Sequence, residues 1–241
     1  MRYAIISDVH GNLEALKSVF KAISRGGVNS IWFLGDAVGY GPNPNECAAI
    51  LKEKTQFQVA GNHDHAVIGR TDIEYFNPYA KAAIKWTKNI MTEKNASILK
   101  DLPITKRIKD EGILLVHATP KEPQKWHYMF TLQDARLNFR FFLEKLCFIG
   151  HTHQPSIVEH SPRGKLTVYM DSVEIKDNHR YIVNAGSVGQ PRDGNPDASY
   201  VICSKNSIEV KRVPYDILLT QKKMHEAGLP LPLIERLAYG T

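Results

Sequence analysis

RYAIISDVHGNLEALKSVFKAI, residues 2–23, contains an apolar run, a polar turn and an amphipathic segment in direct succession. RYAII is short and rich in β-favouring residues, so it predicts a buried strand. Residues 12–23 place apolar side chains at helical spacing, and a glycine pair then ends the predicted helix. Between the two lies SDVHGN, in which Asp8 and His10 stand two positions apart. This hexapeptide is either a polar turn or the first part of a metal site.

The same alternation continues through the first third of the chain. SIWFL (30–34) and FQVA (57–60) predict two further strands. Residues 43–54 begin with Asn-Pro, which fits an N-cap followed by proline at the first helical position. Strands that alternate with helices at this spacing indicate right-handed crossovers and a parallel sheet.

The rest of the chain adds helices first and strands later. Hydrophobic periodicity predicts helices over residues 77–91, 132–145 (with Thr131 as N-cap) and 215–228. Strands are expected over residues 112–118, 146–150, 165–170, 181–186, 199–204 and 207–213. We therefore expect one α/β domain over residues 1–241, with two sheets, outer helices, a helical insertion at about 70–105 and a C-terminal helical segment at about 215–241. The apolar end of that segment either packs on the core or forms a homodimer interface, and the sequence leaves both open.

The composition excludes several classes of protein. The net charge is +6, but the 31 Lys and Arg residues are scattered rather than gathered in one tract, which disfavours dedicated nucleic-acid binding. The three cysteines are odd in number and widely separated, which favours reduced, buried thiols of a cytoplasmic protein. No stretch approaches the roughly 18 apolar residues of a membrane span, so we expect a soluble protein without membrane contact.

Polar side chains capable of binding metal follow five of the predicted strands. The carboxyl ends of parallel strands converge on one edge of a sheet, so residues far apart in sequence meet there. The i, i+2 spacing within the first and last clusters also points each pair to the same side of an extended segment. The residues concerned are Asp8, His10, Asp36, Asn62, His63, His117, His151 and His153.

The residue types indicate which metal the cluster suits. Carboxylate, imidazole and one amide oxygen form a mixed N/O set that suits Mn²⁺, Fe²⁺ or Zn²⁺ better than Ca²⁺ or a thiolate-rich zinc site. The candidate ligands are too many for one tetrahedral ion and suit two ions that share an aspartate and a hydroxide about 3.5–4 Å apart. Taken singly, Asp8 and His10 could be turn residues, GNHD a type I′ turn and His117 a satisfied core histidine. The joint pattern favours the metal site.

Five motifs in this order resemble the signature of the calcineurin-like metallophosphoesterase superfamily: DVHGN, GDAVGYGP, GNHD, VHATP and GHTHQP. The later stretch NAGSVGQPRDGNPDASYVI is similar to the bacterial and archaeal phosphodiesterase branch, which includes dinucleoside-tetraphosphate hydrolase-like members. The resemblance implies a four-layer αββα sandwich. It implies that one metal ion is bound by Asp8, His10, Asp36 and His153. It implies that the other, sharing Asp36, is bound by Asn62, His117 and His151.

The resemblance also implies an activity. A metal-bridging hydroxide would hydrolyse a phosphodiester or phosphoanhydride bond, with His63 protonating the leaving group or steadying its charge. Two divalent ions are expected, Mn²⁺ or Fe²⁺ first, with Zn²⁺ or Ni²⁺ as alternatives. The expected substrate is a small nucleotide such as a dinucleoside polyphosphate. A phosphomonoesterase is the main alternative; a nuclease and a metal-binding scaffold without catalysis are the others.

One departure from the family pattern affects His63. Protein phosphatases and symmetrical dinucleoside-tetraphosphate hydrolases of this superfamily carry Asp-Arg-Gly after the second-motif aspartate, and that aspartate orients the histidine that matches His63. Here Gly39 and Tyr40 stand in those places, so another group must orient His63 or none does. Asn12 and Arg192 are the candidates for phosphate contact, although an arginine in a Pro-Arg-Asp-Gly turn is more often simply a turn residue.

Aromatic residues are the remaining candidates for substrate contact. Trp126 and Tyr128 lie in a polar loop after His117, and Tyr40 lies within the second motif, so all three are expected at the substrate pocket. Tyr75, Phe76 and Tyr79 have helical spacing, which favours core packing of the insertion over stacking on a base.

Overall fold

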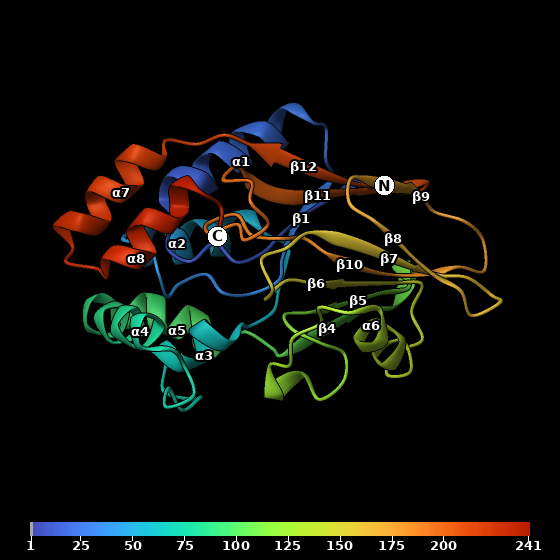
Figure 1. Ribbon diagram of the computed structural model, residues 1–241, viewed down its shortest axis with the longest axis horizontal. Coiled ribbons are helices and arrows are strands. Elements are labelled where there is room, and N and C mark those ends of the chain that lie inside the picture. Colours follow the sequence, from blue (N-terminus) through green and yellow to red (C-terminus); the bar gives the residue numbers. More distant parts are fainter. Residues whose placement is uncertain (1) are drawn as a thin grey trace.

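The computed structural model describes residues 2–241, in which two six-stranded sheets stack face to face with helices on their outer faces (Figure 1). One sheet has the order β3 (Phe57–Gln58), β2 (Ser30–Phe33), β1 (Arg2–Ile6), β11 (Ala198–Ser204), β12 (Ser207–Val213), β9 (Ser172–Glu174). The other has the order β4 (Thr105–Ile108), β5 (Ile113–Val116), β6 (Leu146–Ile149), β10 (Arg180–Asn184), β7 (Ser156–His160), β8 (Leu166–Tyr169). The predicted αββα sandwich is confirmed.

The helices begin at the caps that the sequence indicates. Asn12 accepts a hydrogen bond from the backbone of Ala15, and Asn77 and Thr131 cap two later helices in the same way. The α-helices are α1 (Leu13–Arg25), α2 (Pro44–Lys54), α3 (Asn62–Val67), α4 (Pro78–Ile90), α5 (Glu93–Lys100), α6 (Leu132–Asn138), α7 (Ile217–Glu226) and α8 (Leu231–Glu235). The short 3-10 turns are η1 (Lys109–Glu111), η2 (Pro123–Lys125) and η3 (Arg236–Ala238).

Strand β1 explains why the first apolar run is continuous. Successive side chains of a strand point to opposite faces. Tyr3 and Ile5 are buried between the two sheets, where they pack with residues of both. Ala4 and Ile6 are buried under helix α1 on the outer face. A strand covered on both faces has no solvent-facing position, so its sequence shows no polar alternation.

Parallel pairing brings one end of each sheet to the same place. In the first sheet β1, β2 and β3 run parallel, and in the second β5, β6 and β10 do. The loops that follow β1, β2, β5 and β6 therefore leave neighbouring strand ends and carry the polar clusters of the sequence. Strands β11, β12 and β9 extend the first sheet in antiparallel fashion, away from β3.

The predicted helix over residues 132–145 is wrong in length, because α6 ends at Asn138. The reason is Arg180, whose guanidinium donates to the carbonyl oxygens of Phe139 (3.1 Å), Glu144 (3.2 Å) and Phe142. These bonds hold the chain after α6 in an irregular turn. Arg180 also lies over the Phe142 ring, 4.3 Å from its centroid.

The expected core packing of the insertion is also wrong for two of its three aromatic residues. Tyr75 is 94% exposed and Tyr79 is 49% exposed. Phe76 alone packs as expected, against the apolar clusters beneath it. Strands β4, β7 and β9 were not predicted.

The C-terminal segment packs on the chain itself. Leu233, Ile234 and Leu237 form an apolar cluster with Ala80 of α4 and with Tyr40. In Figure 1 the two C-terminal helices, α7 and α8, lie near α4 at the end of the sandwich from which the loops with the polar clusters extend. Within residues 2–241, no helix is long and apolar enough to cross a membrane.

Arg180→Met is expected to lower the free energy of unfolding by about 2–3 kcal/mol, because three carbonyl groups lose a charged donor. Chemical denaturation followed by circular dichroism measures the change. Arg163→Met, in the exposed turn between β7 and β8, is the matched control and should change stability by less than about 0.5 kcal/mol. Equal losses in the two variants would contradict this role for Arg180.

Candidate metal centre

The structure brings all eight strand-end residues together in one buried cluster. Asp8 and His10 follow β1, and Asp36 follows β2. The others follow β3 (Asn62 and His63, which open α3), β5 (His117) and β6 (His151 and His153). None of the eight exceeds 7% exposure, so they are almost completely removed from solvent.

The first group of facing atoms belongs to Asp8, His10 and His153. The two Nε2 atoms of the histidines lie 3.1 Å apart, and Asp8 Oδ1 lies 3.1 Å from His153 Nε2. His10 Nδ1 lies 3.0 Å from the Val38 carbonyl oxygen, and His153 Nδ1 lies 2.6 Å from that of Gln190. Because a carbonyl requires a donor, each Nδ1 carries the proton and each Nε2 presents a lone pair.

The second group belongs to Asp36, Asn62, His117 and His151. His117 Nδ1 faces the Leu34 carbonyl oxygen at 2.8 Å, so its Nε2 is the unprotonated nitrogen. That Nε2 lies 3.3 Å from Asp36 Oδ2 and 3.2 Å from Asn62 Oδ1. In His151 it is Nε2 that meets a carbonyl oxygen, that of Trp126 at 2.9 Å, which leaves Nδ1 free to bind.

In these contacts two unprotonated ligand atoms face each other with no hydrogen between them. Such an arrangement is typical of atoms that surround a cation. Asp8 Oδ1 is buried and has no hydrogen-bond partner among the described residues. Three groups of three residues have ligand atoms within 4.8 Å of one another: Asp8, His10 and His153; His10, Asp36 and His63; Asp36, His117 and His151. The residues present therefore fit divalent metal ions, and second-coordination contacts to backbone carbonyls orient the imidazoles.

The charges of the site shift several pKa values. Burial would raise the pKa of Asp8, but the His153 and His117 imidazoles hold it well below its usual range. Burial lowers the pKa of His151 to about 3 and that of His153 to about 4. In His117 the Asp36 and Asp8 carboxylates outweigh burial and raise the pKa to about 9. The carboxylates are thus ionised, and most of the imidazoles are neutral and able to bind metal.

Backbone strain is concentrated at the same residues. Non-glycine residues rarely adopt positive φ, and each such residue costs about 1–3 kcal/mol. Five of the candidate ligands do so, with φ between 48° and 67°: Asp8, His10, Asp36, His151 and His153. Trp126, whose carbonyl meets His151, has a φ of 54° as well. Strain stored at so many residues of one cluster indicates a functional site.

Sequence reasoning missed the contribution of Asp64. Its carboxylate accepts hydrogen bonds from the backbone N–H groups of Asp36 (2.8 Å), Ala37 (2.9 Å) and Gly61 (3.0 Å). Burial and the Asp36 charge raise the pKa of Asp64 to about 7. The carboxylate thereby joins the loop after β2 to the start of α3. The motif GNHD contained the signal, an acidic residue in the first turn of a helix.

His63 is oriented by rings rather than by a carboxylate. Its backbone N–H donates to Asp36 Oδ1 at 2.8 Å. Its imidazole packs against the rings of Tyr40 (4.5 Å between centroids), His10 (4.8 Å) and Phe76 (5.2 Å). His63 Nδ1 has no hydrogen-bond partner within residues 2–241. Gly39, at φ 125°, lies so close that a Cβ there would overlap Nδ1.

A cleft of about 490 Å³ opens beside this cluster. Tyr40, Trp126 and Tyr128 line it, as do His63 and His151. Its outer walls come from the α3–α4 loop and the loop after β5, through Thr71, Asp72, Tyr75, Phe76, Asn77, Ala80 and Lys125. A separate surface hollow of about 800 Å³, lined by Phe20, Ser24 and Gln56 among others, lies at the amino-terminal end of β2, away from the cluster.

The two candidates for phosphate contact differ in position. The Asn12 side chain donates to the Gly189 carbonyl oxygen at 2.9 Å and caps α1, so both ends of its amide bond the protein and it does not line the cleft. The Arg192 guanidinium carbon lies 5.7 Å from the centre of the Tyr40 ring. Tyr40 lines the cleft, but Arg192 does not.

A two-sheet sandwich with a buried cluster of histidine, aspartate and asparagine at the strand ends is the architecture of a metallophosphoesterase. The chain belongs to the calcineurin-like phosphoesterase superfamily, whose domain matches residues 1–207. This confirms the predicted resemblance and the class of enzyme, a phosphoester hydrolase. The family is dimetal-dependent, and the His and Asp groups described above could hold the ions.

Relatives of known sequence or structure cover the whole chain. An uncharacterized protein of Methanocaldococcus jannaschii is 40% identical over 242 residues, which cover 98% of this chain and 97% of that protein. A metallophosphoesterase from Sphaerobacter thermophilus is also 40% identical, with a TM-score of 0.88 over 100% of this chain and 99% of that one. A hypothetical protein from Pyrococcus horikoshii OT3 has a TM-score of 0.79 over 100% and 98% of the two chains; at 18% identity it shows the fold alone.

Gly39→Ala is expected to reduce both stability and turnover, because the new Cβ overlaps the His63 imidazole. In a His63→Ala background the same substitution should lower the free energy of unfolding by less, because only the strain of positive φ at residue 39 is left. A double-mutant cycle on thermal midpoints measures the difference, and we expect a coupling of about 1–2 kcal/mol. Additive effects would show that Gly39 does not restrain His63.

Proposed function

We propose that the chain hydrolyses a phosphodiester or phosphoanhydride bond of a small nucleotide with the help of two divalent ions. The observation that carries the proposal is the position of Asp36. Its Oδ2 lies 3.6 Å from His10 Nε2 and 3.3 Å from His117 Nε2, so one carboxylate belongs to both groups of facing atoms. A shared carboxylate between two ligand sets is typical of dinuclear sites.

The proposed ligand sets follow from these two groups. One ion would be held by Asp8, His10, Asp36 and His153. The other would be held by Asp36, Asn62, His117 and His151. The mixed N/O donors suit Mn²⁺ or Fe²⁺, with Zn²⁺ or Ni²⁺ as alternatives. When bound, such ions lower the pKa of coordinated water and neutralise charge on phosphoryl oxygens.

His63 is the proposed catalytic residue. It lines the cleft beside the ligand sets, and its backbone bond to Asp36 Oδ1 fixes it to the shared carboxylate. Because its Nδ1 is enclosed by Gly39 and the aromatic rings, Nε2 is the nitrogen available to the leaving oxygen. The bridging oxygen of the bond that breaks leaves as an alkoxide from an ester or as part of a phosphate from an anhydride, so a nearby imidazole that gives it a proton or a hydrogen bond favours cleavage.

The cleft supports a nucleotide as substrate. Tyr75, which lines the cleft, is almost fully exposed, and Trp126 offers a second aromatic surface in the same cleft. Tyr128 has less ring surface to offer, because its ring stacks with those of His151 (4.1 Å) and Phe130 (5.3 Å), and the residue is 51% exposed. A base would therefore stack on Tyr75 or Trp126 while Tyr128 presents its hydroxyl.

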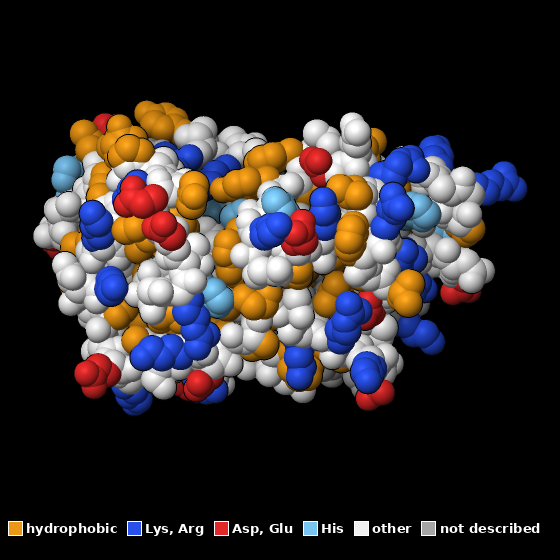
Figure 2. Space-filling view, turned by 90° about the horizontal axis from the view of Figure 1, so that it is seen from below, with side chains coloured by type: hydrophobic (Ala, Val, Ile, Leu, Met, Phe, Trp, Pro, Cys, Tyr) orange, Lys and Arg blue, Asp and Glu red, His pale blue; other side chains and the backbone are white. Residues whose placement is uncertain are grey.

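The exposed charges do not favour a nuclease. Figure 2 shows Lys and Arg side chains spread over one face among apolar and acidic ones, with no continuous basic track. A groove that follows a nucleic-acid backbone requires such a track. A phosphomonoester remains the main alternative substrate, and a panel of monoesters, cyclic nucleotides and diadenosine polyphosphates distinguishes it from a diester.

Asp36→Asn and His63→Ala separate metal binding from catalysis. Both are expected to reduce Mn²⁺-dependent hydrolysis of bis(p-nitrophenyl) phosphate by at least about 100-fold. Only Asp36→Asn should lose metal from both sites, because Asp36 is shared; metal content by mass spectrometry checks this. Two full-occupancy ions in Asp36→Asn would contradict the shared ligand. No turnover of the unsubstituted protein with any divalent ion would support a scaffold instead.

Tyr75→Ala should raise KM for a nucleotide diester by about tenfold, because base–aromatic stacking contributes about 1–3 kcal/mol. KM for a small phosphate ester without a base should be unchanged. Tyr79→Ala is the matched control, since Tyr79 is exposed on the same segment but does not line the cleft. Equal effects of the two substitutions would contradict a base site at Tyr75.

A further inference from the structure

Strand β8 leaves one edge of the second sheet without the protection that the other edges have. Within residues 2–241, β3 and β9 end the first sheet, and β4 and β8 end the second. An edge strand exposes unpaired backbone N–H and C=O groups, and proteins usually protect it by shortness or by charged side chains. The other three edges follow this rule, since β3 has two residues, β9 has three and β4 carries Lys106 and Arg107. In contrast, residues 166–170, LTVYM, contain no charged side chain and no proline.

The register of the β7–β8 hairpin shows which backbone groups face the free edge. Residues of an antiparallel pair alternate between hydrogen-bonded and non-hydrogen-bonded positions. The backbone N–H of Ser161 donates to the Lys165 carbonyl oxygen at 2.9 Å, so these two residues occupy a hydrogen-bonded position. By alternation, Val168 and its opposite residue Val158 occupy a non-hydrogen-bonded position. The N–H and C=O of Val168, and likewise those of Leu166, therefore point away from β7.

An apolar patch adjoins this free edge. Phe130, Leu132, Val168 and Met170 line one surface hollow of about 220 Å³, and all four side chains are exposed. Thr152, from the GHTHQP motif, lines the same hollow. Exposed apolar side chains that gather in one place are typical of surfaces that bind another protein. The edge of β8 therefore offers both backbone groups and apolar area to a partner.

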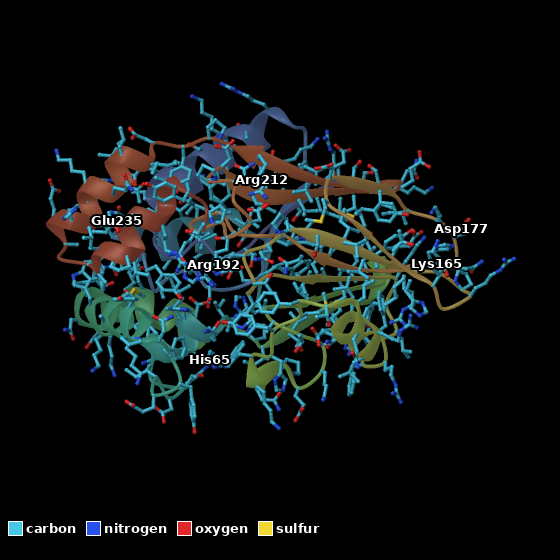
Figure 3. All side chains as sticks on the ribbon, in the orientation of Figure 1. His65, Lys165, Asp177, Arg192, Arg212 and Glu235 are labelled. Carbon is cyan, nitrogen blue, oxygen red and sulfur yellow. The ribbon has the colours of Figure 1, made fainter. Side chains whose placement is uncertain are left out.

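The sequence of β8 is complementary to a second copy of itself. Two copies that pair in antiparallel fashion about a twofold axis at Val168 place each Leu166 opposite Met170 of the other copy. The same register places Lys165 opposite Asp171 at both ends of the paired segment. Both of these charged side chains are exposed, and neither has an ion-pair partner within residues 2–241. Figure 3 labels Lys165, which lies at the end of the sandwich opposite α7 and α8.

We propose that a second copy of this chain binds at the free edge of β8, so that the second sheets of the two copies join into one continuous sheet. Leu166, Val168 and Met170 exchange backbone hydrogen bonds across the twofold axis, and the two Val168 side chains meet at it. Opposite charges on facing residues of antiparallel strands stabilise such a pair, and the symmetry provides this contact twice. The dimer does not depend on the proposed function, because its interface includes none of the candidate metal ligands.

Sedimentation equilibrium of the full chain tests the proposal. The unsubstituted protein is expected to have the mass of two chains, whereas Val168→Lys should have the mass of one, because two like charges then meet at the axis. Val168 is 44% exposed, so a lysine there can extend into solvent, and circular dichroism checks that the variant is folded. Val168→Thr keeps the branched shape and should remain dimeric. A monomeric unsubstituted protein at about 100 μM would overturn the proposal.

An exchange of charges tests the register. Lys165→Glu and Asp171→Lys should each raise the dissociation constant of the dimer at least about tenfold, because attraction becomes repulsion at two contacts. The double variant should return to within about threefold of the unsubstituted protein. Lys94→Glu, which makes the same charge change at an exposed position of α5, is the matched control and should have no effect. A double variant no tighter than the single ones, or a dimer that persists in Val168→Lys, would show that another surface joins the copies and would overturn the proposal.

Discussion

Electrostatic repulsion between the lone pairs of buried ligands is the constraint on which the rest of the structure depends. Asp8 and Asp36 are ionised and buried, and the backbone carbonyls that accept from Nδ1 of His10 and His117 leave Nε2 of each neutral ring facing these carboxylates. Taking a carboxylate out of water costs several kcal/mol unless a positive charge compensates it. His117 supplies part of that charge when it is protonated, since its pKa is about 9, but protonation occupies the nitrogen that should bind metal. Divalent ions would resolve this conflict, because a cation can accept electron pairs from the carboxylates and the imidazoles together.

The scaffold must hold this arrangement against strain as well as repulsion. The candidate ligands adopt left-handed backbone conformations directly after rigid strands, and the two sheets fix where those strands end. Close backbone contacts complete the restraint: a Cβ on Gly61 would overlap the Asp36 side chain, and one on Gly150 would overlap Ser7 and Asp8. Asp64 adds three hydrogen bonds across the same gap. Gly61 of GNHD and Gly150 of GHTH are thus required by the packing of the loops against one another.

The sequence predicts the parts of the structure that depend on local pattern. Buried strands, capped helices and polar residues at strand ends leave periodic signals, so the layers and the candidate ligands were found together. Strands β4 and β9 were missed because they are short and consist mostly of polar residues that are not buried. Strand β7 was missed although its centre is buried, because it begins just after the polar GHTHQP motif and contains a serine, a glutamate and a histidine. The end of α6 depends on Arg180, about forty residues later, and no local pattern records that contact. Tyr75 lies just before α4 and is almost fully exposed. Its exposure depends on how this segment packs against the rest of the chain, which helical spacing alone does not reveal.

The environment of Tyr40 is where this chain departs from the protein-phosphatase pattern, and the departure has a physical consequence. Gly39 cannot supply a carboxylate, and the space that a side chain would need is filled by His63 itself. Packing against Tyr40 and Phe76 replaces the missing hydrogen bond, and Tyr40 is in turn covered by Leu233 and Leu237 of the C-terminal segment. An imidazole restrained by rings has no carboxylate hydrogen-bonded to its Nδ1, so its orientation depends on the packing of residues that lie more than 150 positions away in sequence. The C-terminal segment, which lies beyond the matched family domain, is therefore part of what shapes the site.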